Sequence, residues 1–124
     1  MSLTEENKKT IMTALINNLT RITDKEYQQR IWIECAGPEW EDFDEAVCQF
    51  FDIAIPLLDD YKNFNITKKQ YILLKTFIAI FTDFCNNNDY PEEFIDTPEW
   101  NNITKLAQEV LIAFNYQKDS QSFS

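Results

Sequence analysis

The sequence contains no histidine and a single glycine, Gly37, among its 124 residues. The missing histidine removes the side chain that most often serves as a general base and as a ligand for transition metals. One glycine cannot form a glycine-rich phosphate-binding loop, and no nucleophile motif of the Gly-x-Ser-x-Gly or Ser-x-x-Lys type is present. We therefore expect no catalytic site, no cofactor and no metal, and we predict that the protein is not an enzyme.

Cysteines are few, and there is no long apolar run. The three cysteines are an odd number and lie far apart, so they match neither a disulfide framework nor the closely spaced pairs of a zinc site. Each lies in an apolar stretch, and we predict that Cys35, Cys48 and Cys85 are reduced thiols buried in the core. No apolar segment reaches the roughly 20 residues of a membrane span, and the first residues lack the basic-then-apolar pattern of a signal peptide. We expect a cytoplasmic protein that does not bind a membrane.

Positive charge is scarce as well. Lys and Arg number 11 against 21 Asp and Glu, which gives a formal net charge of -10. A surface of this sign repels the phosphates of nucleic acids and of anionic lipids, and it attracts basic surfaces. The charge therefore predicts a basic protein partner and no direct binding to nucleic acid.

The shortage of turn-forming residues bears on the fold. With one glycine and four prolines, the chain has little material for tight hairpins and favours long helices. A length of 124 residues fits a single domain, and 44% hydrophobic residues suffice for one core. We predict an all-α fold, a five-helix up-and-down bundle of residues 1–116, followed by a polar, frayed C-terminal tail at residues 117–124.

Capping patterns and apolar periodicity place the five helices. Ser2, Thr23 and Thr67 are each followed three residues later by Glu or Gln, which is the capping-box pattern of a helix start. Thr97 before Pro98 predicts another start, since proline is favoured at the first helical position. The expected helices span approximately residues 2–20, 23–36, 41–61, 67–86 and 97–114, with one more helical turn near residues 90–94.

Apolar residues recur at spacings of three and four along the last three helices, as on the buried face of an amphipathic helix. The expected core residues are Phe43, Val47, Phe50, Ala54, Leu57, Leu58 and Tyr61 in the third, Tyr71, Leu74, Phe77, Ile78, Phe81 and Phe84 in the fourth, and Trp100, Ile103, Ala107, Val110, Leu111 and Phe114 in the fifth. Pro56 lacks the amide that would bond to the carbonyl of Asp52, so we expect it to kink or split the third helix.

The acidic residues gather in two segments that contain no Lys or Arg, residues 31–61 and 76–104. In an up-and-down bundle, the connections after the second and the fourth helix lie at the same end. These are the two most acidic connections, so we predict one acidic end, which is a candidate docking surface for a basic partner. The opposite end is expected to gather Arg21, Lys25, Lys62, Lys68 and Lys69.

Aromatic residues lie among the acids of these connections, an arrangement typical of tight interfaces. The candidate partner-binding residues are Glu39, Trp40, Glu41, Asp44, Glu45, Asp89, Tyr90, Glu92, Glu93 and Phe94. Two other interpretations stay open. The acids can form solvated helix faces and favourable charges at helix N-termini, and Trp40 and Phe94 can plug the end of the bundle, which leaves Tyr90 as the better candidate for exposure.

The segment Asp89-Tyr90-Pro91 through Asp96-Thr97-Pro98-Glu99 resembles the Tyr-Pro and Asp-Ser-Pro pattern that leads into an interface helix of colicin-type immunity proteins. In size and acidity the chain is similar to the all-helical immunity proteins with which bacteria neutralise their own toxins, including those of polymorphic and contact-dependent inhibition systems. The local likeness covers about a tenth of the chain. The chain departs from the colicin-type pattern in its greater length and its additional helix.

The resemblance implies a non-catalytic inhibitor whose acidic, aromatic-rich surface covers the basic active-site cleft of a cognate toxin domain. A second interpretation is a regulatory or adaptor bundle, or a nucleic-acid mimic that blocks a basic host protein. A third is a homodimer that is joined through its fourth or fifth helix. The clustering of acids with aromatics favours the first two interpretations, whereas an uncharged apolar patch would favour the third.

Overall fold

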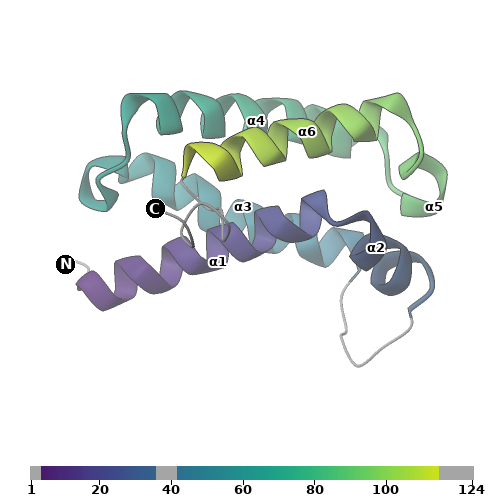
Figure 1. Cartoon of the computed structure of the whole chain (residues 1–124), viewed down its shortest axis with the longest axis horizontal. Helices are drawn as coiled ribbons and strands as arrows, with labels where there is room; N and C mark the ends of the chain where they lie inside the picture. Colours follow the sequence, from purple (N-terminus) through teal and green to yellow (C-terminus); the bar gives the residue numbers. More distant parts are fainter. Residues whose placement is uncertain (1–3, 36–41, 115–124) are drawn as a thin grey trace, which may run out of the picture.

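The computed structural model describes residues 4–35 and 42–114, and Figure 1 shows them as an assembly of helices. The elements are α1 (Glu5–Thr23), α2 (Lys25–Tyr27), the π-helix η1 (Gln28–Ile33), α3 (Phe43–Asp59), the 3-10 helix η2 (Tyr61–Phe64), α4 (Lys68–Asn87), α5 (Pro91–Phe94) and α6 (Pro98–Ala113). Every regular element within the described residues is a helix, which confirms the predicted all-α bundle. The candidate residues Glu39, Trp40 and Glu41 and the tail at residues 117–124 lie outside the described residues.

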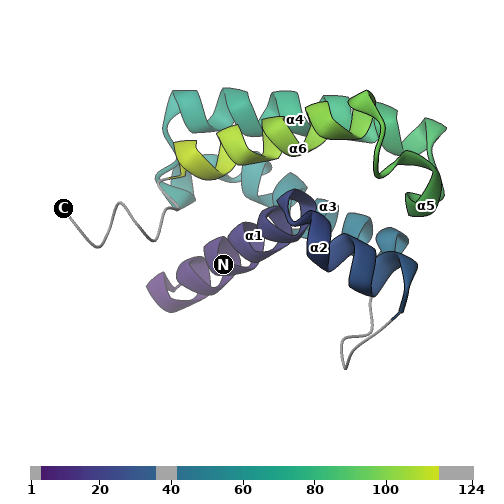
Figure 2. The same ribbon diagram turned by 45° about the vertical axis from the view of Figure 1, so that its right-hand side comes forward.

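The four long helices α1, α3, α4 and α6 form the body of the bundle and alternate in direction (Figure 1). In Figures 1 and 2, α4 and α6 form one layer, and α1 and α3 form the other. α1 packs against α3 and α6, and α4 packs against the same two helices. The short helix made of α2 and η1 lies beside α5. Both are at the end of the bundle where the C-terminus of α1 lies (Figure 1).

The turn between α1 and α2 explains the position of this short helix. α1 continues past its expected end at residue 20 and includes Thr23, whose hydroxyl donates to the carbonyl of Thr20 over 2.8 Å. The N-cap of the next helix is therefore Asp24 and not Thr23, and its side chain accepts a hydrogen bond from the amide of Tyr27. Because the turn consists of Asp24 alone, α2 and η1 stay at this end of the bundle.

The predicted starts of α4 and α6 are confirmed. The hydroxyl of Thr67 accepts a hydrogen bond from the amide of Gln70 over 3.1 Å, and the amide of Thr67 donates to the side chain of Gln70 over 2.9 Å. This is a complete capping box. Thr97 caps α6 by accepting from the amide of Trp100, with Pro98 at the first helical position. The Thr-Pro pair thus begins a long helix, as the sequence predicts.

α3 passes through Pro56 and ends at Asp59, so Pro56 does not split this helix, and the alternative expectation of a kink stays a prediction. Pro56 lies in the last turn, its carbonyl accepts a hydrogen bond from the amide of Asp60, and it is exposed. The carbonyl of Asp52, which loses its helical partner, belongs to an exposed residue that water can reach. Leu57 follows the proline and is 1% exposed, so its burial holds the last turn on the core.

Aromatic rings from α3, α4 and α6 form the centre of the core. Phe50, Phe77, Phe81 and Trp100 are at most 2% exposed, and the ring centroid of Phe50 lies 5.4 Å from that of Phe77. α1 contributes Leu15, Leu19 and Ile22. The expected stripes are confirmed, except that some of their members are only half-buried, namely Val47, Leu58, Tyr61, Tyr71, Ile78 and Phe114.

One buried polar side chain fixes the short helix to α1. Gln28 is 0% exposed, and its amide nitrogen donates to the carbonyls of Arg21 and Ile22, each over 2.8 Å. These carbonyls belong to the last turn of α1, where helix carbonyls lack partners within the helix. Gln28 therefore caps α1 from the following helix and holds η1 at the end of the bundle.

All three cysteines are free, but the prediction that they are buried is wrong for two of them. Cys35 follows η1 with a φ angle of 54° and is exposed, and Cys48 is exposed on α3. Cys85 is half-buried. The apolar neighbours of these residues in sequence face the core, and the helical period turns Cys48 away from it.

Candidate docking surface

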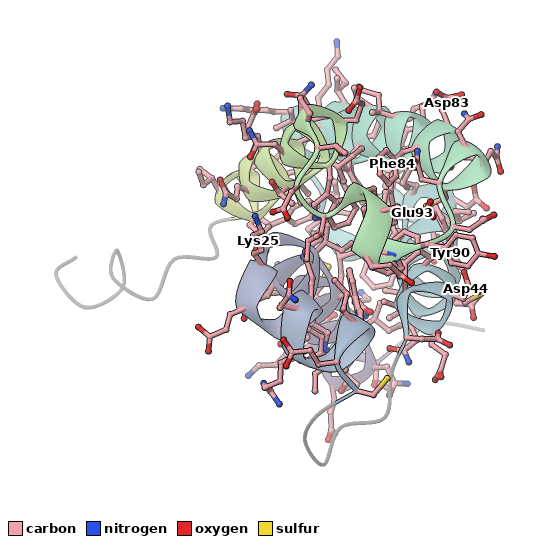
Figure 3. All side chains as sticks on the ribbon, turned by 90° about the vertical axis from the view of Figure 1, so that its right-hand side faces the viewer. Lys25, Asp44, Asp83, Phe84, Tyr90 and Glu93 are labelled. Atoms are coloured by element: carbon pink, nitrogen blue, oxygen red, sulfur yellow. The ribbon has the colours of Figure 1, made fainter. Side chains whose placement is uncertain are left out.

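The first turns of α3 and α5, which carry acids of the two base-free segments, lie at one end of the bundle. Asp44 and Glu45 are exposed in the first turn of α3, and Glu92 and Glu93 are exposed in the first turn of α5. Figure 3 shows Asp44, Tyr90 and Glu93 together on this end. We define the end surface as Asp42, Asp44, Glu45, Asp83, Asp89, Tyr90, Glu92 and Glu93. It holds the described members of the candidate set except Phe94, and its binding to a partner stays a prediction.

Asp42 and Asp44 show how α3 positions its acids. Asp42 is the N-cap, and its side chain accepts a 2.8 Å hydrogen bond from the amide of Glu45. Asp44 lies close enough to α4 to act on Cys85. Burial, and secondly the negative charge of Asp44, raise the pKa of the Cys85 thiol from 9.0 to about 12. This thiol is therefore protonated at neutral pH, and it is a poor nucleophile.

α5 is held by two buried residues and presents its other side chains to solvent. Pro91 is buried, and Phe94 is 2% exposed, with its ring centroid 4.8 Å from that of Trp100 and 5.0 Å from that of Phe84. Phe94 therefore plugs the end of the bundle, and its assignment as a partner-contacting residue is wrong. Tyr90, by contrast, is 57% exposed at the start of α5.

The end of the bundle has an acidic side and a mixed side. In Figure 3, Asp83, Tyr90 and Asp44 lie toward α3 and α4, whereas Lys25 lies toward α1 and α6. Lys25 forms an ion pair with Asp96, which follows α5. The expected position of Lys25 at the opposite end is therefore wrong, because the one-residue turn after α1 keeps α2 beside α5.

Arg21 is a second base that the structure places near this end. It lies in the last turn of α1, donates to the side chain of Gln49 over 3.4 Å, and has its guanidinium 6.0 Å from the ring centroid of Tyr27. Lys62, Lys68 and Lys69 do lie at the opposite end, as expected. They are near Asp59 and Asp60 in the chain. The prediction that all five basic residues gather at the opposite end is therefore wrong for Arg21 and Lys25.

Helix dipoles account for some of the acids at this end but not for all of them. Glu45, Glu92 and Glu93 lie in first turns, where a negative charge stabilises the helix by about 0.3 to 1 kcal/mol. Asp83 and Asp89 lie before and after the C-terminus of α4, where the same dipole disfavours negative charge, and the last turn of α4 contains no basic residue. Asp89 also directly precedes the N-cap of α5, where an acid is favourable, so Asp83 is the acid that helix dipoles do not explain.

The described residues contain no group of three or more His, Cys, Asp or Glu side chains placed to hold a metal ion. None of the helices described in Figure 1 is long and apolar enough to span a bilayer.

Comparison with known proteins finds no family model, no curated protein and no solved structure that matches this chain significantly. The likeness to immunity proteins therefore stays a prediction. Within the segment that carries it, Tyr90 precedes the start of α5 and Thr97 caps α6, so both parts of the pattern coincide with helix starts.

Proposed function

We propose that this chain is a non-catalytic inhibitor that binds a basic protein partner through its end surface, in the manner of a bacterial immunity protein acting on a cognate toxin. The observation that carries the proposal is the position of Tyr90. This residue is 57% exposed, and it lies among acids from two separate base-free segments of the chain. Exposed aromatic rings surrounded by charge are typical of interface anchors.

The charge distribution supports binding over a purely structural role. Asp83 lies one turn before the C-terminus of α4, where the helix dipole does not favour an acid. An acidic surface also attracts a basic partner before contact, and such steering raises association rates by about tenfold or more at low salt. The acids of the end surface therefore support the binding of a basic partner.

The proposed mechanism is occlusion. The acids of α3 and α5 orient the basic cleft of the partner, and the ring of Tyr90 then enters the contact and loses its water. α5 is fixed on the core by Phe94 and Pro91, so it presents Tyr90 without reordering. A preorganised surface binds more tightly because less conformational entropy is lost on association.

The proposal is tested by capturing the partner with the protein as bait from the cells that produce it. The wild type is compared with a triple variant, Asp44→Lys, Glu92→Lys and Glu93→Lys, and with a control variant, Lys62→Glu, Lys68→Glu and Lys69→Glu. We expect the wild type and the control to retain a basic protein that the first variant loses. The purified partner should then lose its activity at one equivalent of wild-type protein.

Two results would contradict the proposal. Equal capture by the wild type and the Asp44, Glu92 and Glu93 variant would mean that the end surface does not bind the partner. Capture without loss of the partner's activity would indicate an adaptor and not an inhibitor. If the captured protein binds nucleic acid and the chain competes for that site, the inhibitor acts as a nucleic-acid mimic.

A further inference from the structure

A stripe of incompletely buried apolar side chains runs along the seam between α3 and α4. We define this α3–α4 flank as Cys48, Phe51, Ile55 and Leu58 of α3 with Ile78 and Cys85 of α4. The α3 members recur at spacings of three and four residues, so they share one side of the helix. The ring of Phe51 lies 5.7 Å from that of Phe81, which places the stripe against α4. Ile55 is 45% exposed.

The flank is continuous with the end surface. Asp44 lies one turn before Cys48 on α3, and its carboxylate is close enough to Cys85 on α4 to act on that thiol. In Figure 3, Asp44, Asp83 and Tyr90 all lie on the α3 and α4 side of the end. A partner that contacts Tyr90 and Asp44 therefore reaches the first residues of the flank.

Charge along the flank indicates the kind of partner that fits it. Asp52 and Asp59 are exposed on α3, one turn before and one turn after Ile55, and no Lys or Arg occurs between Arg30 and Lys62. An apolar stripe with acids along its edge complements an apolar stripe with bases along its edge. A second copy of this chain, whose net charge is -10, would instead place acids against acids.

The size of the contact also favours an extension onto the flank. A stable interface buries about 800 Å² on each partner, and the end surface offers one exposed aromatic ring and a set of acids. The stretch of α3 from Asp44 to Ile55 adds roughly 16 Å of length. An amphipathic helix is the element that fits a straight seam between two helices, because its apolar face can lie along the seam while its polar edges stay solvated.

We propose that the α3–α4 flank is the second half of the docking surface and receives an amphipathic helix of the partner whose apolar stripe is bordered by Lys and Arg. This inference rests on the proposed function, since it concerns the same partner. It adds a different kind of contact. The end surface attracts and orients the partner by charge, and the flank binds its apolar side chains.

The test uses a defined probe and does not need the natural partner. The probe is a Leu and Lys peptide of about five helical turns with all Leu on one face, and its control is a scrambled peptide of the same composition. The reporter is the rate of alkylation of Cys48 in the full chain with Cys35→Ser and Cys85→Ser. Backbone amide shifts along α3 and α4 are recorded in parallel. We expect the amphipathic peptide, and not the scrambled one, to slow the alkylation and to shift the amides of Phe51 and Ile55.

Two matched variants locate the apolar contact. Ile55→Ser removes an exposed isoleucine from the flank, and Ile112→Ser removes one that is 54% exposed on α6, outside the flank. We expect Ile55→Ser to weaken the binding of the amphipathic peptide about tenfold, and Ile112→Ser to change it less than twofold. Both side chains are about half exposed, so both variants are expected to fold, which near-identical circular dichroism would verify.

Each of the other results overturns the inference. Equal binding of the scrambled peptide, or an equal effect of Ile112→Ser, would show that the flank recognises charge alone or that another face binds. Backbone amide shifts confined to Tyr90, Glu92 and Glu93 would also overturn the inference about the flank, while the proposed function would stand. A peptide that does not bind at all refutes the flank as a site, and the capture experiment decides the proposed function separately.

Discussion

The indole nitrogen of Trp100 donates a 2.9 Å hydrogen bond to the side-chain carbonyl of Gln28, across 72 residues of sequence. Trp100 is 2% exposed and belongs to α6, whereas Gln28 begins η1. The amide nitrogen of the same glutamine caps α1. One side chain therefore joins three helices and orients the short helix that lies beside the end surface.

Gln28→Ala is expected to lower the free energy of unfolding by about 3 kcal/mol, because it removes the partner of the buried Trp100 indole, the buried hydrogen bond to the carbonyl of Ile22, and one of the two donors to the carbonyl of Arg21. The measurement is urea denaturation followed by circular dichroism. The control is Gln29→Ala at the exposed neighbouring position, which should change the stability by less than about 0.5 kcal/mol. Similar losses for both variants would show that the hydrogen bonds of Gln28 do not stabilise the fold.

Phe94 and Tyr90 are expected to behave in opposite ways although both belong to the α5 region. Phe94→Ala should lower the free energy of unfolding by about 3 kcal/mol or more, since its ring contacts Trp100 and Phe84 in the core. Tyr90→Ala should leave the stability within about 0.5 kcal/mol and instead speed the dissociation of the partner. Thermal denaturation and surface plasmon resonance measure the two effects, and a large stability loss for Tyr90→Ala would contradict its assignment as an exposed anchor.

Reversing the charges of Asp44, Glu92 and Glu93 is expected to slow association with the partner about tenfold at low salt, with a smaller effect at high salt. The reason is the loss of long-range attraction, which salt screens in the wild type. Association rates at two ionic strengths measure this effect. The matched reversal of Lys62, Lys68 and Lys69 should leave the rate nearly unchanged, and an acceleration as large as the slowing in the acidic variant would mean that net charge alone matters.

The raised pKa of Cys85 predicts a loss of stability at alkaline pH. Unfolded Cys85 ionises near its ordinary value of 9.0, whereas folded Cys85 stays protonated until about pH 12. Between these values the unfolded state holds fewer protons, so the free energy of unfolding falls as pH rises through this window. Urea titrations of the wild type and Cys85→Ala from pH 8 to pH 11 test this, and equal slopes against pH for the two proteins would contradict it.

The sequence predicts the fold well because helices depend on local signals. The capping residues Thr67 and Thr97 and the periodic apolar residues of α3, α4 and α6 act within a few residues of themselves. The path of the chain between α1 and α3 is less predictable, because the second helix spans only Lys25–Ile33 and stays at the end where α1 ends, which keeps Arg21 and Lys25 there.

The candidate site was predictable in part for the same reason. Base-free segments and the alternation of helix direction bring Asp44, Tyr90 and Glu93 together without any long-range information. The burial of Phe94 depends on rings from α4 and α6, which no local pattern specifies. Gln28 was missed as a core residue, although it lies on the same helical side as Ile31, three residues later, which is the available signal.

The packing of α1 against α6 also constrains how the protein forms during synthesis. α1 leaves the ribosome before α6, which is the helix that covers it and whose Trp100 donates to Gln28. Until α6 emerges, the apolar face of α1 and the acceptor of Gln28 lack their partners, and the growing chain cannot close its core. The end surface consequently acquires its final shape only when translation of α6 is complete, so truncated products would not compete with the full-length protein for a partner.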